Sequence, residues 1–272
     1  MQLCHNTLYL QQSHNKPDVL NEGLMWAVPT TSFYIYFLDK YRFSDARNYL
    51  AATQYILDEY ENEFNAAKEA KRLPEDEDIS MKYCSLRTRL DYGWAKYGNM
   101  LLLHLKHKLF QNPDERIKDI GSQVTDNIVS NLSDAKAIFL HTIKWHEKVK
   151  AYFSETGNTF LYLSMRYNIA LTYKYLECFE PDRSMRIKMH KRRVQMLKDI
   201  LVLTKPYKEL LLLYMYTDMF ISCGTVIDMM MENAEIAGKP FTEIKTEVLE
   251  YVKNCVQCWE KYYAELTCLK TD

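Results

Sequence analysis

The stretch that decides the fold is TFLYLSMRYNIALTYKYLECFEPDRSMRIKMHKRRVQMLKDILVL, which runs from Thr159 to Leu203. Its apolar first half ends near Leu176, and Pro181 and Asp182 then turn the chain. Proline cannot continue a helix, and Asp182 or Ser184 can cap the next one. The stretch therefore predicts a helical hairpin, the unit from which helical solenoids are stacked. In its second half, apolar and ring side chains recur at the spacing of one helix face: Ile187, His190, Val194, Leu197 and Leu201.

The composition of the 272-residue chain favours helices throughout. Hydrophobic residues make up 47%, and the 7 glycines and 7 prolines leave little material for the turns of a sheet protein. The net charge of -1 does not favour nucleic acid or an anionic membrane as a partner. No apolar run approaches the roughly 20 residues that span a bilayer, so membrane insertion is not expected. We predict an all-α protein.

Similar spacing predicts the helices before this hairpin. Met1–His14 is predicted to be helical, and the next helix is expected over Trp26–Leu38, with Pro29 in its first turn, where proline is tolerated. The acidic run 68–78 is interpreted as a solvated loop, and two long helices are expected over Ile79–Leu109 and from Ser133 or Asp134 to Ser154. Between Trp26–Leu38 and the acidic run lies a stripe without a break in the three-four alternation: Phe43, Ala46, Leu50, Thr53, Leu57, Tyr60 and Phe64.

After the hairpin, the sequence predicts a segment over Pro206–Ser222, a short helix from Thr225 to Ala237 and a last helix from Thr242. No polar capping helix follows the last helix, and arrays of hairpins usually need one. We therefore expect the array to extend beyond these residues. The stripe predicted to be buried on the last helix is Val248, Val252, Cys255, Trp259, Tyr262 and Leu266.

The pair formed by Trp26–Leu38 and the helix from Phe43 resembles a tetratricopeptide repeat. Such a repeat needs a small residue early in its second helix and bulk four residues later, and Ala46 and Leu50 fit. Tyr34 stands near the place of the usual small glycine, so the repeat is degenerate. The resulting fold prediction is an α-solenoid of degenerate tetratricopeptide-like hairpins, one array over 1–272 made of repeats over 1–67, the acidic loop 68–78, long helices over 79–158 and hairpins over 159–272.

No pattern in the sequence indicates catalysis, a cofactor or a small-molecule substrate. Cys255 and Cys258 form a CxxC, but a zinc site needs four ligands and no second pair lies at ligand spacing. His104 and His107 could share a helix face without the residues of a known metal motif. With no signal peptide evident, the 7 cysteines are interpreted as reduced thiols. We therefore expect no catalytic residue, no cofactor and no metal.

Three stretches of the sequence resemble one protein family. CFEPDRSMRIKMHKRRVQML (178–197), centred on Lys188–Arg193, resembles a signature of the family of KIF-binding, or kinesin-binding, proteins. WAVPTTSFYIYFLDKYRFSDARNYLAA (26–52) is a second match, and YGWAKYGNMLL (92–102) is a weaker third. The three occur in the order that the family shows, and together they are similar to a middle-to-late portion of a longer protein.

The resemblance implies a regulatory protein of the cytoplasm and cytoskeleton that holds a kinesin motor domain in a concave groove. It implies control of microtubule attachment by steric competition, with roles in axonal transport, mitochondrial positioning and neuronal development. In such a hairpin the first helix lines the groove, and Arg186–Arg193 would add a second contact region in which Lys191 and Arg192 are more structural. The candidate partner-binding residues are Gln11, Thr31, Ser32, Ile35, Asp39, Arg186, Lys191 and Arg192.

Two other interpretations stay open. A generic peptide-binding adaptor or scaffold of the same fold would read a carboxylate with Lys, Arg and Asn side chains, but Trp26–Leu38 carries no Lys or Arg. The basic run Lys188–Arg193, taken alone, is typical of a solvated helix face and next of a nuclear-localisation or phosphate-binding segment.

Overall fold

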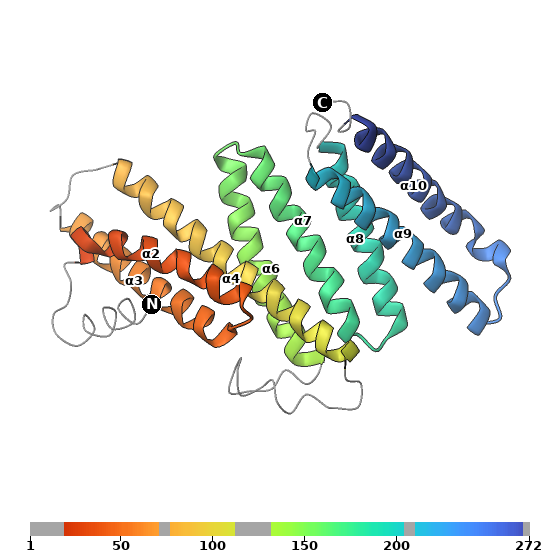
Figure 1. Ribbon diagram of the computed structural model, residues 1–272, viewed down its shortest axis with the longest axis horizontal. Coiled ribbons are helices and arrows are strands. Elements are labelled where there is room, and N and C mark those ends of the chain that lie inside the picture. Colours follow the sequence, from red (N-terminus) through yellow and green to blue (C-terminus); the bar gives the residue numbers. More distant parts are fainter. Residues whose placement is uncertain (1–18, 71–76, 112–131, 204–209, 269–272) are drawn as a thin grey trace. The chain divides into compact units, whose positions relative to one another are not determined.

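The computed structural model describes residues 19–70, 77–111, 132–203 and 210–268, and these ranges contain helices and no strand (Figure 1). The elements are α2 (Val19–Asp39), α3 (Phe43–Glu69), α4 (Glu77–Gln111), α6 (Leu132–Glu155), α7 (Thr159–Leu176), a short 3-10 helix η1 (Glu177–Phe179), α8 (Arg183–Leu203), α9 (Leu210–Ile236) and α10 (Phe241–Cys268). The prediction of an all-α fold is confirmed for this part of the chain. The expected helix over Met1–His14, with Gln11, lies outside the described residues.

The chain divides into two compact units, each with its own core. Unit 1 comprises residues 1–101 and 115–129, and unit 2 comprises 102–114 and 130–272. The helix α4 contributes its first part to unit 1 and its last turns to unit 2.

In unit 1, α2 and α3 form a hairpin around a tight turn. Tyr41 takes a left-handed backbone conformation there, with φ 56°, and the backbone N–H of Arg42 donates to the carbonyl of Phe37 at 2.8 Å. The Arg42 side chain holds both ends of the turn, because its Nε donates to Asp45 at 2.7 Å and its guanidinium lies 4.9 Å from the Phe37 ring centre. Ala46 and Leu50 are completely buried between the helices.

The helix α2 begins seven residues earlier than predicted, so the expectation that Pro29 lies in a first turn is wrong. Pro29 is in the interior of the helix. A proline there removes one backbone hydrogen bond, but side-chain hydroxyls add bonds in the same turn. Thr30 donates to the carbonyl of Ala27 at 2.9 Å, and Thr31 donates to that of Val28 at 2.7 Å. The buried apolar face of α2 then outweighs the local cost.

The first part of α4 packs against α2 and α3 through Gly93. A Cβ atom at this glycine would lie 2.6 Å from the Leu50 Cδ2 and 3.1 Å from the Tyr34 ring, both of which are buried. Polar contacts flank the site, since Trp94 donates its indole N–H to Gln54 at 3.1 Å and Tyr83 donates its hydroxyl to Glu61 at 2.7 Å. The close approach of three helices therefore requires a residue without a side chain here.

Replacing Gly93 with valine is expected to lower the free energy of unfolding by about 1–3 kcal/mol, because the new side chain overlaps Leu50 and Tyr34. The matched control is the same substitution at Gly224, which lies inside α9 with open space around a new Cβ. That variant should change stability by no more than about 0.5 kcal/mol. Urea unfolding followed by circular dichroism measures both, and equal stabilities would contradict the packing described for Gly93.

In unit 2, successive helices pack against one another in chain order from α6 to α10 (Figure 1). The predicted hairpin over Thr159–Leu203 is confirmed as α7 and α8, and Asp182 caps α8 by accepting from the backbone N–H of Ser184 at 2.8 Å. At the other end, Asn158 caps α7 by accepting from the N–H of Leu161 at 3.1 Å. All five predicted stripe residues of α8 are buried.

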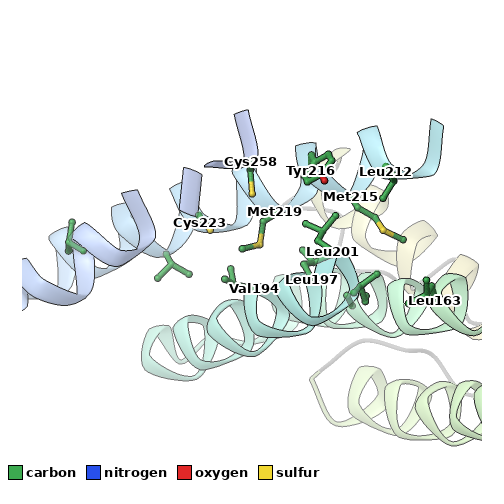
Figure 2. Close-up of a cluster of buried hydrophobic side chains, with 14 of the residues drawn as sticks. Leu163, Val194, Leu197, Leu201, Leu212, Met215, Tyr216, Met219, Cys223 and Cys258 are labelled. Atoms are coloured by element: carbon green, nitrogen blue, oxygen red, sulfur yellow. The ribbon is translucent and has the colours of Figure 1, made fainter. Parts of the chain in front are cut away.

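The prediction of a short helix starting at Thr225 is wrong, because α9 runs without interruption from Leu210 to Ile236. A glycine in a helix interior costs about 1 kcal/mol relative to alanine, and Gly224 lowers the local preference accordingly. The apolar face continues across it and outweighs that cost. Its buried members include Leu212, Met215, Tyr216, Met219, Cys223, Val226 and Met230, which Figure 2 shows in part beside Val194, Leu197 and Leu201 of α8.

The stripe predicted to be buried on the last helix is only partly correct. Val248 is buried and Cys255 and Tyr262 are half-buried against α9, but Val252 and Trp259 are exposed. The helix carries apolar side chains on more than one face, and the spacing alone does not say which face meets α9. The structure turns Ile244, Val248, Tyr251, Cys255, Cys258 and Tyr262 toward the core.

Candidate functional site

The first candidate surface is the side of α2 that faces away from α3. Its apolar members Met25, Val28, Ile35 and Tyr36 expose between 38% and 75% of their surface. Ser32 and Asp39 are exposed on the same side of the helix. We call these six residues the α2 outer face. The opposite side is fully packed, since Ala27, Tyr34, Phe37 and Leu38 are buried.

Four of the five candidate residues predicted for this region can be placed. Ser32, Ile35 and Asp39 lie on the α2 outer face, spaced by three and four residues, so one partner could contact all of them. Thr31 does not, because only 6% of its surface is exposed. It lies on the face that meets α3, between Ala27 and Tyr34, and its hydroxyl is used inside the helix. The expectation that Thr31 belongs to the exposed stripe is therefore wrong, and Gln11 lies outside the described residues.

The chemistry of the α2 outer face is that of a protein-binding surface. Apolar and aromatic side chains are exposed together at helical spacing, and a contiguous apolar patch on a folded protein commonly marks an interaction site. The polar members are a hydroxyl and one carboxylate, which offer an acceptor for a basic or amide group of a partner. Among the described residues, no group of three or more His, Cys, Asp or Glu side chains has the geometry to hold a metal ion.

The second candidate region is the basic run Lys188–Arg193 of α8, and its side chains separate into an inner and an outer set. His190 and Arg193 point inward and are almost completely buried, beside the apolar Ile187 and Val194. Lys188 and Arg192 are exposed. The run is therefore not a uniformly solvated face.

Arg193 belongs to a buried polar cluster that joins α7, α8 and α9. Its guanidinium lies 2.9 Å from the carboxylate of Asp218 on α9, and only 2% and 6% of these two residues are exposed. Lys174 donates to the same carboxylate at 2.7 Å, and the Tyr167 hydroxyl donates to it at 2.7 Å. We call Tyr167, Lys174, Arg193 and Asp218 the Asp218 cluster. One carboxylate thus receives donors from two other helices and fixes their relative register.

The pKa values of Asp218 and Tyr167 shift in opposite directions. Burial alone would raise the pKa of Asp218, but the charge of Arg193 and the hydrogen bonds from Lys174 and Tyr167 lower it below its ordinary value. Burial, together with the nearby Asp218 charge, raises the pKa of Tyr167. The carboxylate is therefore held ionised and the phenol neutral, as a structural ion pair requires.

His190 makes the connection to the turn between α7 and α8. Its Nε2 lies 2.5 Å from the carboxylate of Glu177 in η1. Burial would raise the pKa of Glu177, but the hydrogen bond and charge of His190, with the charges of Lys106 and Arg193, lower it. The burial of His190 agrees with its predicted place on the apolar stripe of α8.

The outer candidates on α8 differ in what they contact. Lys191 forms an ion pair with Glu247 of α10, and the guanidinium of Arg192 lies 5.2 Å from the Tyr173 ring centre of α7. Arg186 is half-buried and forms no ion pair within the described part of the chain. Lys191 and Arg192 thus contact neighbouring helices of the same unit, and the structural role expected for them stays a prediction.

Sequence reasoning missed the counter-ions of this region. Asp218 lies in the run LLLLYMYTDMFISC, where it is the one charged residue in fourteen. A buried carboxylate in so apolar a helix has to be paired. The isolation of Asp218 in this run could therefore have predicted that it has a buried cationic partner. Glu177, by contrast, lies in a turn that also contains Glu180, and nothing in the sequence distinguishes the two.

The CxxC of α10 lies against α9 rather than in an open site. Cys258 is buried and Cys255 half-buried, and the Cys255 thiol lies 3.7 Å from the carbonyl of Phe220. Burial raises the pKa of Cys258 to about 11 and also raises that of Cys255. Both are thus neutral thiols at neutral pH, which makes them weak nucleophiles.

None of the described helices has both the length and the apolar character needed to cross a bilayer.

These features define a class: a helical-hairpin protein whose distinctive surface suits binding another protein. The comparisons give the family. The family profile described as "KIF-1 binding protein C terminal" matches residues 24–121 and 106–271, so the chain belongs to the KIF-binding protein family. The match includes both the α2 outer face and the basic run of α8.

Curated relatives carry the same name. The KIF-binding protein of Drosophila melanogaster is 22% identical over 95% of this chain and 47% of its own length. The Danio rerio protein is 26% identical over 73% of this chain and 37% of its own, and that of Xenopus tropicalis 24% identical over 96% and 47%. This chain thus spans about half the length of the curated relatives it matches. No solved structure matches it.

Proposed function

We propose that this chain binds the motor domain of a kinesin and controls its attachment to microtubules. The relatives' printed name supports a kinesin as partner. The observation that carries the choice of surface is the α2 outer face, an exposed apolar strip on a helix whose other side is fully buried. Since no pattern in the sequence favours catalysis, we propose that the chain acts only by covering the surface that the motor uses to bind microtubules.

The proposed mode of binding places a helix of the motor along α2. An amphipathic helix binds in a groove through side chains at three-four spacing. On α2, Val28, Ser32, Ile35 and Asp39 follow the same spacing and could contact such a helix along its length. Ser32 and Asp39 would fix the orientation of the bound helix through hydrogen bonds, because they are the polar members of the α2 outer face. We propose that the hairpins stack as a solenoid and that the bound motor helix is one the motor otherwise uses on the microtubule.

A second contact from α8 belongs to the same proposal in a reduced form. Arg186 is the one of the three α8 candidates with neither an ion pair nor a ring contact among the described residues, so we propose it as the α8 contact for a carboxylate of the partner. Lys191 and Arg192 act by holding α10 and α7 in place. The proposed cellular consequence is regulation of kinesin-driven axonal and mitochondrial transport in the cytoplasm, with an effect on neuronal development.

The test of the surface is a double substitution on the α2 outer face, Ser32→Arg with Ile35→Asp. Both side chains are exposed, so the fold should be retained, while a charged pair replaces a hydroxyl and an apolar anchor. Binding of a purified kinesin motor domain, measured by biolayer interferometry, is expected to weaken at least tenfold, about 1.4 kcal/mol.

The control is Tyr55→Arg, a substitution of an exposed aromatic residue of α3 in the same unit. Its affinity for the motor should match that of the parent. A double variant with the parent's helical content and undiminished affinity would show that another surface binds the motor.

A further inference from the structure

The helix α10 carries a second, exposed apolar strip beside the face that packs on α9, and Trp259 of this strip also contacts Phe220 of α9, with 5.9 Å between the ring centres. Leu249, Val252, Val256, Trp259 and Tyr263 each expose between 39% and 60% of their surface. They follow one another at intervals of three, four, three and four residues. Among the described helices of unit 2, α10 is the last in chain order, and it packs on α9 mainly through the neighbouring face that carries Val248, Cys255 and Cys258 (Figure 1).

This spacing is a heptad pattern, the sequence period of helices that pair side by side. Leu249, Val256 and Tyr263 occupy the a positions, and Val252 and Trp259 occupy the d positions. The g positions hold Val248, Cys255 and Tyr262, which are turned toward α9. A partner helix can therefore approach over a and d, with the e side open.

The e positions hold Lys253 and Glu260, one of each charge. Both are exposed, and neither forms an ion pair with any residue that the structure describes. In an antiparallel pair of helices, e residues lie opposite e residues of the partner, and such charges set partner and orientation. Two antiparallel copies of α10 would place Lys253 of each opposite Glu260 of the other.

The arrangement is self-complementary, as a two-fold interface requires. A parallel pair would instead set each e residue beside a g position, and the g positions of α10 carry no charge and face α9. The charges therefore favour the antiparallel orientation over the parallel one.

We propose that this chain forms a dimer in which α10 packs antiparallel against α10 of a second copy. The apolar strip forms the core of the interface, and two Lys253–Glu260 ion pairs flank it. The proposal is independent of kinesin binding, because it uses a different helix and the other unit.

The test is the mass of the whole 272-residue chain, measured by sedimentation velocity over a concentration series. The parent is expected to be dimeric. Val256→Glu, which puts a charge at the centre of the strip, should give a monomer, whereas Leu140→Glu should leave the dimer intact. Leu140 is equally apolar and highly exposed, but it lies on α6.

Charge reversal tests the orientation. Lys253→Glu alone and Glu260→Lys alone should each weaken dimerisation at least tenfold, because like charges then face each other. The double variant Lys253→Glu with Glu260→Lys should restore it. A parent chain that stays monomeric at its highest soluble concentration overturns the proposal. A dimer that the double variant fails to restore overturns the antiparallel pairing.

Discussion

Replacing Asp218 with alanine is expected to lower the free energy of unfolding by about 3–5 kcal/mol. The substitution leaves the guanidinium of Arg193 without its counter-ion at a position where only 2% of that residue is exposed. Removing one partner of a buried ion pair costs this much because the remaining charge is no longer compensated. Lys174 and Tyr167 lose the same acceptor, although the Lys174 side chain is 30% exposed and can turn to solvent.

The control is Asp199→Ala. Asp199 also pairs with an arginine, Arg166, at 3.4 Å, but its side chain is 45% exposed. An exposed pair is worth about 0–1 kcal/mol, so this variant should remain close to the parent. A second variant, Asp218→Leu with Arg193→Met, removes both charges and should recover most of the loss. Urea unfolding measures all three, and an Asp218→Ala protein as stable as Asp199→Ala would show that the cluster does not hold the helices together.

Acidification is expected to destabilise the fold through His146. This histidine of α6 is buried, and burial lowers its pKa from an ordinary 6.5 to about 4. Between these two values the unfolded chain binds a proton at this site that the folded chain does not. The contribution of neutral His146 is therefore complete above pH 6.5 and is lost as the pH falls to about 4. The loss amounts to about 3 kcal/mol, at about 1.4 kcal/mol for each unit of pKa.

A His146→Leu variant separates this contribution from that of the carboxylates. Over the same pH range the parent should lose about 3 kcal/mol more stability than the variant, because leucine has no proton to bind. His141 on the same helix is exposed, so His141→Leu is the matched control for exchanging an imidazole for leucine. Parallel stability curves for the parent and His146→Leu would contradict the assignment.

The three-four spacing predicted the presence of helices, but it gave neither every helix boundary nor the side of each helix that is buried. The α8 stripe was predicted correctly because one face is apolar and the other is charged. On α10 both faces are apolar, so Val252 and Trp259 were assigned to the core although they are exposed. Gly224 lowered the local helix preference, and a continuous buried face on α9 outweighed it.

The candidate site shows the same division. The assignment of Trp26–Leu38 to the groove came from the resemblance, and the structure places Ser32, Ile35 and Asp39 on an exposed side of that helix. Thr31 was misplaced because a threonine is compatible with either face, and its hydroxyl is satisfied inside the helix. Arg193 stood out in the sequence as part of a basic run, but its burial depends on Asp218, which lies 25 positions further along the chain on another helix.

The central claim is that this chain keeps a kinesin motor off the microtubule, and microtubule co-sedimentation tests it most directly. A purified motor domain would be spun with taxol-stabilised microtubules in the presence of a non-hydrolysable ATP analogue, with the parent chain or with Ser32→Arg/Ile35→Asp. The account predicts that the parent chain leaves the motor in the supernatant and that the double variant lets it pellet. A motor that pellets equally with and without the parent chain would contradict the account.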